Sequence, residues 1–83
     1  MKLLYFAWLK TKTGVSEETV SPPAEVETVA DLLTWLKQRG PAFEDALADV
    51  EALRVAVNQE YAEMTDPVTA GDEVALFPPV TGG

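Results

Sequence analysis

The sequence predicts an α+β fold, in which one main helix and a short second helix cover a mixed sheet of about five strands. The chain has 83 residues, which suits one domain with a single modest core. A capped, amphipathic helical segment at 28–40 lies between two groups of short runs rich in β-branched and aromatic residues. A helix with one apolar stripe has to bury it, and a sheet formed by the flanking runs provides the partner surface.

Residues 2–9 (KLLYFAWL) form the first expected strand, because the run is short and rich in aromatic residues. Both alternating faces of this run are apolar, with Leu3 and Tyr5 on one and Leu4 and Phe6 on the other. Two interpretations stay open: a central strand covered on both sides, or a strand with one face in an interface. Residues 10–15 are expected to form a hairpin loop, and 17–20 an edge strand that the following prolines end.

The main helix has the clearest signals in the chain. Thr28 is a plausible N-cap, and Asp31 completes a variant of the capping box. Gly40 is expected as the C′ residue after the helix, with Pro41 preventing its continuation. Residues 41–49 are expected to form the short second helix. The apolar positions of the main helix follow at i, i+3, i+4 and i+7, and they are Val29, Leu32, Leu33 and Leu36.

Three further strands are expected in the carboxyl-terminal half, at 53–57, 61–64 and 73–77. Asn58-Gln59 is a candidate two-residue turn between the first two, because Asn tolerates positive φ. The first and last strands of the chain can pair in parallel at the centre, because a long crossover separates them. In that arrangement Leu3, Tyr5, Val74 and Leu76 face the helix, and the opposite face carries an apolar patch of Leu4, Phe6 and Phe77.

The composition excludes several classes of function. Fourteen acidic residues against six basic ones give a net charge of −8, which argues against binding nucleic acid or an anionic membrane surface. The chain has no Cys and no His, so thiolate zinc sites, cysteine nucleophiles and the commonest general base are all missing. We expect no intrinsic cofactor or metal. With no signal region and no long apolar run, we expect a cytoplasmic protein.

The carboxyl terminus, residues 77–83 (FPPVTGG), has an unusual order of residue types. Pro78 and Pro79 end the last strand and favour an extended chain. Two residues without Cβ atoms suit a narrow tunnel in a partner, although a terminal Gly-Gly is also common in frayed ends. We therefore expect a domain at 1–79 and an extended tail at 80–83. The reactive group would be the α-carboxylate of Gly83, which needs no catalytic side chain.

These residues resemble a known family, the small sulfur-carrying subunits of molybdopterin synthase, which have a ubiquitin-like β-grasp fold. The resemblance is strongest in the tail, GDEVALFPPVTGG at 71–83. It extends in order to LLYFAWLK at 3–10, to Thr28-Val29 with Leu32-Leu33, and to VAVNQ at 55–59. Residues 41–53 match only in general character. The resemblance thus spans essentially the whole chain.

The resemblance implies a specific carrier chemistry. An activating enzyme similar to the E1 enzymes of ubiquitin conjugation uses MgATP to adenylate Gly83, and a sulfur donor converts the adenylate to a thiocarboxylate. The tail, with Val80, Thr81 and Gly82, then enters the large synthase subunit, in a heterotetramer, and gives up its sulfur to build the dithiolene of molybdopterin. Phe6, Phe77 and Leu4 match apolar positions that contact that partner. Lys10 stands where the family often has Arg, so a partner contact there would lack the bidentate geometry of a guanidinium.

Other functions stay open at this point. The same fold and terminal Gly-Gly would suit another sulfur carrier, such as the thiamin thiazole type, or a protein-conjugating tag. A non-covalent β-grasp interaction module, with incidental glycines, is a third interpretation. An independent hydrolase is disfavoured, because scattered acids such as Asp45 and Asp49 resemble a solvated helix face and nothing indicates a raised carboxyl pKa.

Overall fold

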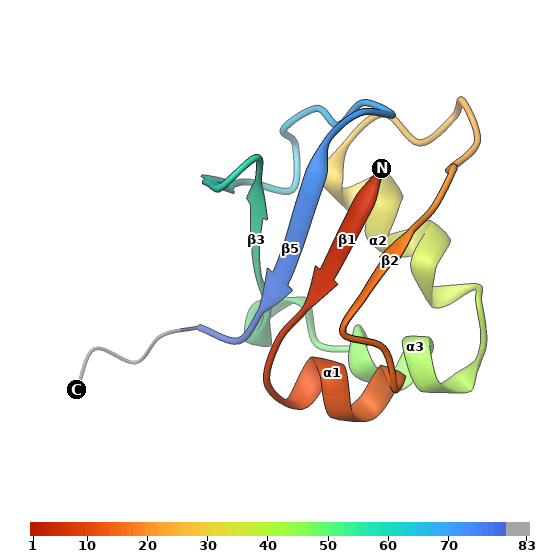
Figure 1. Ribbon diagram of the computed structural model, residues 1–83, viewed down its shortest axis with the longest axis vertical. Coiled ribbons are helices and arrows are strands. Elements are labelled where there is room, and N and C mark those ends of the chain that lie inside the picture. Colours follow the sequence, from red (N-terminus) through yellow and green to blue (C-terminus); the bar gives the residue numbers. More distant parts are fainter. Residues whose placement is uncertain (80–83) are drawn as a thin grey trace.

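The computed structural model describes residues 1–79 and contains one five-stranded mixed sheet in the order β2-β1-β5-β3-β4 (Figure 1). The central strands β1 and β5 are parallel, and the other neighbours are antiparallel. The prediction of a parallel central pair is therefore confirmed. The strands are β1 (Lys2–Tyr5), β2 (Glu17–Thr19), β3 (Arg54–Val57), β4 (Glu60–Ala62) and β5 (Glu73–Phe77).

One helix, α2 (Val29–Lys37), crosses behind the sheet, while α1 and α3 lie together beyond the carboxyl ends of β1 and β5 (Figure 1). The capping box predicted for α2 is confirmed. The Thr28 hydroxyl accepts a hydrogen bond from the Asp31 N–H at 3.2 Å, and the Asp31 carboxylate accepts one from the Thr28 N–H at 3.2 Å. The remaining helices are α1 (Trp8–Thr13), α3 (Pro41–Ala46) and the 3₁₀ helix η1 (Val50–Ala52).

The core lies between the sheet and its helices, and it takes every second residue of the central strands. Leu3 and Tyr5 of β1 are 0% and 1% exposed, and Val74 and Leu76 of β5 are both 0% exposed. This confirms which face of the sheet meets the helix. The predicted apolar stripe of α2 is buried against them, and its members are Val29, Leu32, Leu33 and Leu36.

The prediction of a strand at 2–9 followed by a hairpin loop at 10–15 is wrong beyond Tyr5. β1 ends there, and α1 occupies most of the segment expected to form a hairpin loop. The break is at Ala7, which has φ 55° and ψ −133°, a positive-φ conformation that no strand residue adopts. An L-residue in such a region costs on the order of 1–3 kcal/mol. Leu9 is buried, and it reaches the core from α1 instead of a strand.

Two boundaries around the main helix also differ from the prediction. Helix α2 ends at Lys37 with Gln38 as its C-cap, so Gly40 is not its C′ residue. Gly40, with φ 145°, instead precedes α3 as its N-cap, and Pro41 takes the first position of that helix, which needs no N–H donor. Helix α3 is shorter than the predicted 41–49, because residue 49 caps η1 with its side chain.

The predicted two-residue turn between β3 and β4 is confirmed. Asn58 and Gln59 have φ 52° and 70°, as a type I′ hairpin requires. The Asn58 amide also joins this turn to the start of β5, because its Nδ2 donates to the Asp72 carboxylate at 3.0 Å and its Oδ1 accepts from the Glu73 N–H at 3.1 Å. Hydrogen bonds from Asn58, and then from the Thr69 N–H, lower the pKa of Asp72.

Candidate functional site

The outer face of the sheet, opposite the core, carries the residues that sequence analysis placed in an interface. The register pairs Leu4 with Ala75. The chain continues this pairing for one more residue, since the Phe6 N–H donates to the Leu76 carbonyl at 3.1 Å. The same register therefore places Phe6 beside Phe77, the last residue of β5. Alternation of side chains puts these residues on one face, as predicted.

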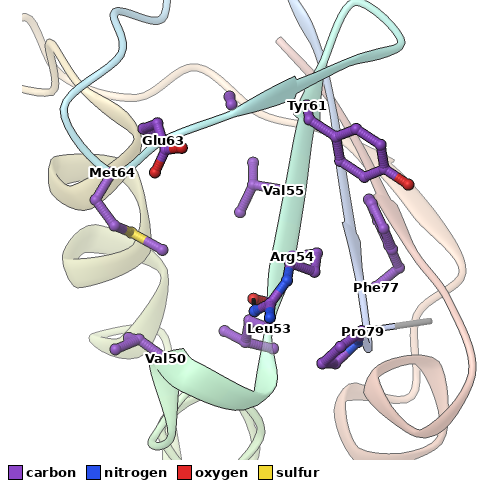
Figure 2. A pocket seen from close by; sticks show the side chains of 10 residues that line it. Val50, Leu53, Arg54, Val55, Tyr61, Glu63, Met64, Phe77 and Pro79 are labelled. Carbon is purple, nitrogen blue, oxygen red and sulfur yellow. Dashed lines mark hydrogen bonds between the residues drawn. The ribbon is translucent and has the colours of Figure 1, made fainter. Parts of the chain in front are cut away.

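Sequence analysis missed one residue of this face, Tyr61 on β4. The register pairs Ala56 with both Ala75 and Tyr61, so Tyr61 shares the face of Phe77. The rings of Tyr61 and Phe77 lie 5.8 Å apart, centroid to centroid, and project to the same side of β3 (Figure 2). The Asn58-Gln59 turn fixes this pairing, so its register could have revealed Tyr61. We call the following set the outer apolar patch: Leu4, Phe6, Ala56, Tyr61, Ala75 and Phe77.

The outer apolar patch is accessible although it is apolar. Phe6 is 48% exposed and Tyr61 is 77% exposed, while Leu4 and Phe77 are half-buried. Two aromatic rings that are this exposed are unusual for a domain with a filled core, and contiguous exposed apolar surface marks an interaction site. The patch includes positions from four neighbouring strands, so the sheet itself holds its shape.

An open groove of about 540 Å³ lies next to the patch, along the lower half of β3 where β4 no longer pairs (Figure 2). The Arg54 side chain fixes one end of it, since Nη1 donates to the carbonyls of Leu53 at 2.8 Å and Glu51 at 3.2 Å. Pro79, the last described residue, lines the same groove as Phe77. The described chain thus ends between the patch and this groove.

Lys10 lies on α1 and not in the expected loop, but it remains at the end of the sheet near Phe6. It is exposed, and within residues 1–79 no carboxylate lies at ion-pair distance from it. The other lysine of α1, Lys12, makes an ion pair with Asp45 at 3.0 Å, and its ammonium lies 5.7 Å from the centre of the Trp8 ring. Lys10 is therefore the lysine of α1 whose charge can meet a partner.

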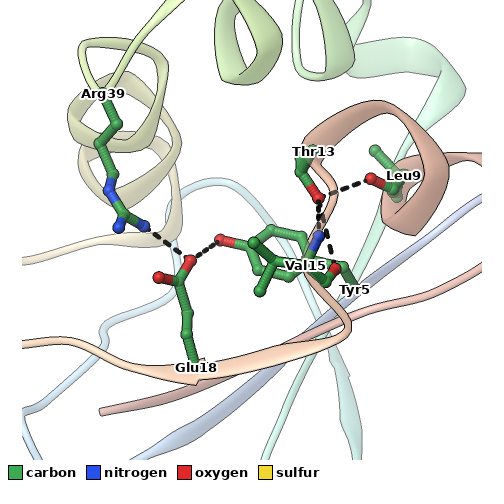
Figure 3. Close-up of polar contacts among 6 residues, drawn as sticks. All are labelled: Tyr5, Leu9, Thr13, Val15, Glu18 and Arg39. Carbon is green, nitrogen blue, oxygen red and sulfur yellow. Dashed lines mark hydrogen bonds and ion pairs between the residues drawn. The ribbon is translucent and has the colours of Figure 1, made fainter.

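A polar cluster supports the other side of β1, beneath the patch. The Tyr5 hydroxyl donates to Glu18 Oε2 at 2.7 Å, and Arg39 Nη1 donates to the same oxygen at 2.6 Å (Figure 3). The guanidinium also lies 4.8 Å from the centre of the Phe43 ring, which meets Tyr5 edge-on. Arg39 follows the end of α2 and ties β2 to α3.

This cluster shifts three pKa values. Burial, followed by the hydrogen bond to Glu18, raises the pKa of Tyr5 far above its usual range. Burial alone would raise the pKa of Glu18, but the hydrogen bonds from Arg39 and Tyr5 and the charge of Arg39 outweigh it and lower the pKa. The hydrogen bond to Glu18 raises the pKa of Arg39. At neutral pH the shifts favour an ionised Glu18 and Arg39 and a neutral, hydrogen-donating Tyr5, which are the forms that these contacts require, so we assign the cluster a structural role.

The predicted tail residues Val80, Thr81, Gly82 and Gly83 lie outside the described residues. Within residues 1–79, no three His, Cys, Asp or Glu side chains are grouped closely enough to hold a metal ion. No helix in the same range has the length and apolarity to cross a membrane. The candidate functional features of residues 1–79 are the outer apolar patch and the groove that Pro79 lines.

A mixed sheet with parallel central strands, crossed on one face by a single main helix, defines the ubiquitin-like β-grasp class. The sequence matches the ThiS family over residues 3–83. A molybdopterin synthase sulfur carrier subunit from Homo sapiens is 39% identical over 100% of this chain and 93% of its own length. One from Escherichia coli K12 is also 39% identical, over 100% and 99% of the two chains. The chain belongs to the ThiS family, and these two relatives, which it matches over nearly their full length, are molybdopterin synthase sulfur carrier subunits.

Solved structures agree on the fold. SAMP1 from Haloferax volcanii, a small archaeal modifier protein, superposes with a TM-score of 0.79 at 34% identity, covering 100% of this chain and 98% of its own. Subunit 1 in a protein–protein complex of subunits 1 and 2 of the molybdopterin-converting factor from Helicobacter pylori gives a TM-score of 0.65 at 20% identity, covering 99% and 96%. At that identity the second likeness concerns the fold alone.

Proposed function

We propose that this protein is the sulfur carrier subunit of a molybdopterin synthase, acting in the cytoplasm. The observation that carries the proposal is that the described chain ends between the outer apolar patch and the groove. Phe77 ends β5 within the patch, and Pro79 follows at the groove. A partner that covers the patch would therefore receive the tail at the same time. Relatives that match the whole chain have this function in their names.

The proposed chemistry takes place at the main chain. An E1-like enzyme uses MgATP to join the Gly83 carboxylate to AMP and releases pyrophosphate. AMP is a good leaving group, so sulfur from a donor attacks the carbonyl carbon, displaces AMP and leaves a thiocarboxylate. The thiocarboxylate sulfur then bonds to the pterin precursor, and water cleaves its bond to the Gly83 carbonyl carbon, which leaves the sulfur on the precursor and restores the carboxylate. The carrier's own side chains serve for docking, and the catalytic side chains belong to its partners.

The proposed partner surface consists of the outer apolar patch and Lys10. In the complex, the large subunit covers Phe6, Tyr61 and Phe77, and the tail residues Val80, Thr81 and Gly82 lead Gly83 into its active site. Two carriers on a dimeric large subunit would form a heterotetramer. The names of the relatives that match the whole chain, which call them subunits of molybdopterin synthase, support a partner subunit.

A mass measurement on the intact protein tests this chemistry. After incubation with the activating enzyme, MgATP and a sulfur donor, we expect the mass increase that corresponds to one oxygen replaced by sulfur. Deletion of Gly83, or addition of one residue after it, should abolish both the mass change and synthase activity without changing the melting temperature. Full sulfur transfer by either variant would overturn the proposal.

A second candidate function is a protein modifier, and the high structural similarity to SAMP1 favours considering it. It uses the same adenylated terminus, but a lysine amine of a target protein replaces sulfur as the nucleophile. The two functions separate by product: a thiocarboxylate on the free carrier, or an isopeptide-linked conjugate. Conjugates that form in cell extract and depend on Gly83, with no thiocarboxylate, would favour the modifier.

A further inference from the structure

The turn that joins β1 to α1 contains an alanine in a conformation typical of glycine. The Leu9 N–H donates to the Phe6 carbonyl at 3.1 Å and closes a four-residue turn. Ala7 is the second residue of that turn, with φ 55° and ψ −133°. These angles are those of the first central residue of a type II′ turn, where glycine dominates because a Cβ atom is strained there.

Nothing inside the described domain accounts for this methyl group. Ala7 is exposed, so its side chain adds nothing to the core. It is the N-cap of α1, yet alanine offers no side-chain acceptor and no such hydrogen bond is made. The hydrogen bonds of the turn use its carbonyl, which accepts from Lys10 N at 3.1 Å and from Thr11 N at 3.3 Å. Glycine would supply the same carbonyl without the strain.

The position of the turn suggests what the methyl group does. Ala7 directly follows Phe6, which is 48% exposed and belongs to the outer apolar patch. It precedes α1, the helix that carries Lys10, which is exposed and makes no ion pair with residues 1–79. Ala7 is thus on the surface between the apolar and the charged parts of the proposed interface. Strained residues that persist at exposed positions are concentrated at sites of binding or catalysis.

We propose that Ala7 is a contact residue, whose methyl group packs against an apolar surface of the partner that covers the outer apolar patch. The strained turn fixes both the direction of this methyl group and the orientation of the neighbouring Phe6. The identity of that partner, the large synthase subunit, rests on the proposed function. Keeping a side chain at position 7 lowers the stability of the free carrier, because the turn is strained by the Cβ atom.

Replacing Ala7 by glycine tests the proposal, because it should move stability and affinity in opposite directions. Relief of the strain should raise the melting temperature of Ala7→Gly by roughly 4–8 °C. Loss of the methyl contact should weaken binding to the large subunit by about 3- to 10-fold, mainly through faster dissociation. An unchanged or stronger affinity would overturn the proposal.

Ala70→Gly provides the matched control. It also deletes one exposed methyl group, but it lies in the turn before β5, at the opposite end of that strand from Phe77, and its φ is not positive. We expect it to leave affinity unchanged and to lower the melting temperature slightly. If both glycine variants weaken binding equally, the effect is not specific to the surface beside Phe6, and the proposal is wrong.

A chemically synthesised chain with D-alanine at position 7 separates the contact from rigidity. For a D-residue these angles are the mirror image of a favoured extended conformation, so the strain disappears while the turn stays stiff. The methyl group, however, takes the place of the α-hydrogen and points elsewhere. We expect Ala7→D-Ala to bind as weakly as Ala7→Gly. Full affinity of the D-alanine protein would assign the effect of glycine to flexibility and overturn the contact.

Failure of this inference can be distinguished from failure of the proposed function. Phe77→Ala, measured in the same titration, should weaken binding whether or not Ala7 is a contact. If Phe77→Ala weakens binding and Ala7→Gly does not, only the inference about Ala7 falls. If neither variant changes the affinity, the outer apolar patch is not the docking surface, and both proposals are overturned.

Discussion

The two faces of the sheet consist of alternate residues of the same strands, and both are apolar, yet only one is covered. Leu76 on the inner face is 0% exposed, whereas its neighbour Phe77 on the outer face is half-buried. On β1 the same contrast separates Tyr5, at 1%, from Phe6, at 48%. A chain of 83 residues supplies helices for one layer only, so the second apolar face is left for another molecule.

This contrast shows how a small domain can separate stability from binding. Residues of the inner face pack against α2 and hold the sheet in shape, while those of the outer face give up burial in the free protein and gain it in a complex. Substitutions on the two faces should therefore affect different measurements, even between adjacent residues. Substitutions on the inner face, on the outer face, in the polar cluster and on α1 test this separation.

The largest effect is expected on the inner face. Leu76→Ala leaves a cavity beside its buried register partners Tyr5 and Val55 and should lower the free energy of unfolding by about 2–5 kcal/mol. Denaturant unfolding measures this change. At a temperature where the variant is folded, its affinity for the large subunit should stay within about twofold of the original. A loss of less than about 1 kcal/mol would mean that the inner face is not the stabilising one.

Replacing Phe77, the adjacent residue on the outer face, should weaken binding more than it lowers the free energy of unfolding. Phe77→Ala removes a ring that would be covered only in the complex, and we expect about 2 kcal/mol less binding energy, or roughly a 30-fold higher Kd. Its free energy of unfolding should fall by only about 1 kcal/mol, from the lost contact with Tyr61. Calorimetric titration and thermal unfolding provide the two numbers. A large stability loss with unchanged affinity would place Phe77 in the core.

The cluster beneath β1 should affect stability but not binding, with a dependence on pH. The pKa of Glu18 is lowered in the folded protein, so its contribution is present above the unfolded pKa of about 4.3 and is lost as pH falls through the folded value. Glu18→Gln should therefore cost about 1 kcal/mol at pH 7. Unfolding of both proteins between pH 3 and 7 checks this. A difference that grows toward low pH would contradict the sign of the shift.

The smallest effect is expected at Lys10, whose charge is exposed. Lys10→Ala should weaken binding to the large subunit by about 0.2–1 kcal/mol, and the difference should shrink as salt screens the charge. Lys12→Ala is the matched control on the same helix, since Lys12 already pairs with Asp45. Equal salt-sensitive losses of affinity in the two variants would show that net charge, and not the position of Lys10, steers the complex.

Much of the fold was predicted from local signals. The capping box at Thr28, the apolar stripe of α2, the Asn58-Gln59 turn and the strand at 73–77 all involve neighbouring residues whose preferences agree. The predictions were wrong where tertiary contacts determine the local structure. The run at 2–9 has strand composition throughout, but the chain breaks at Ala7 so that α1 can bury Leu9 and meet α3. Gly40 looked like the end of one helix, but it begins the next.

The sequence by itself determined the class of fold and the alternation that leaves Phe6 and Phe77 outside. The tertiary structure decided which further residues join Phe6 and Phe77 in the outer apolar patch, and which distant side chains meet. Tyr61 reaches the patch only through the register of β3 and β4, and Glu18 meets Arg39 across 21 residues of chain. The strain at Ala7 is likewise invisible in composition. Such features depend on distant segments meeting in space, and local sequence preferences carry no information about that meeting.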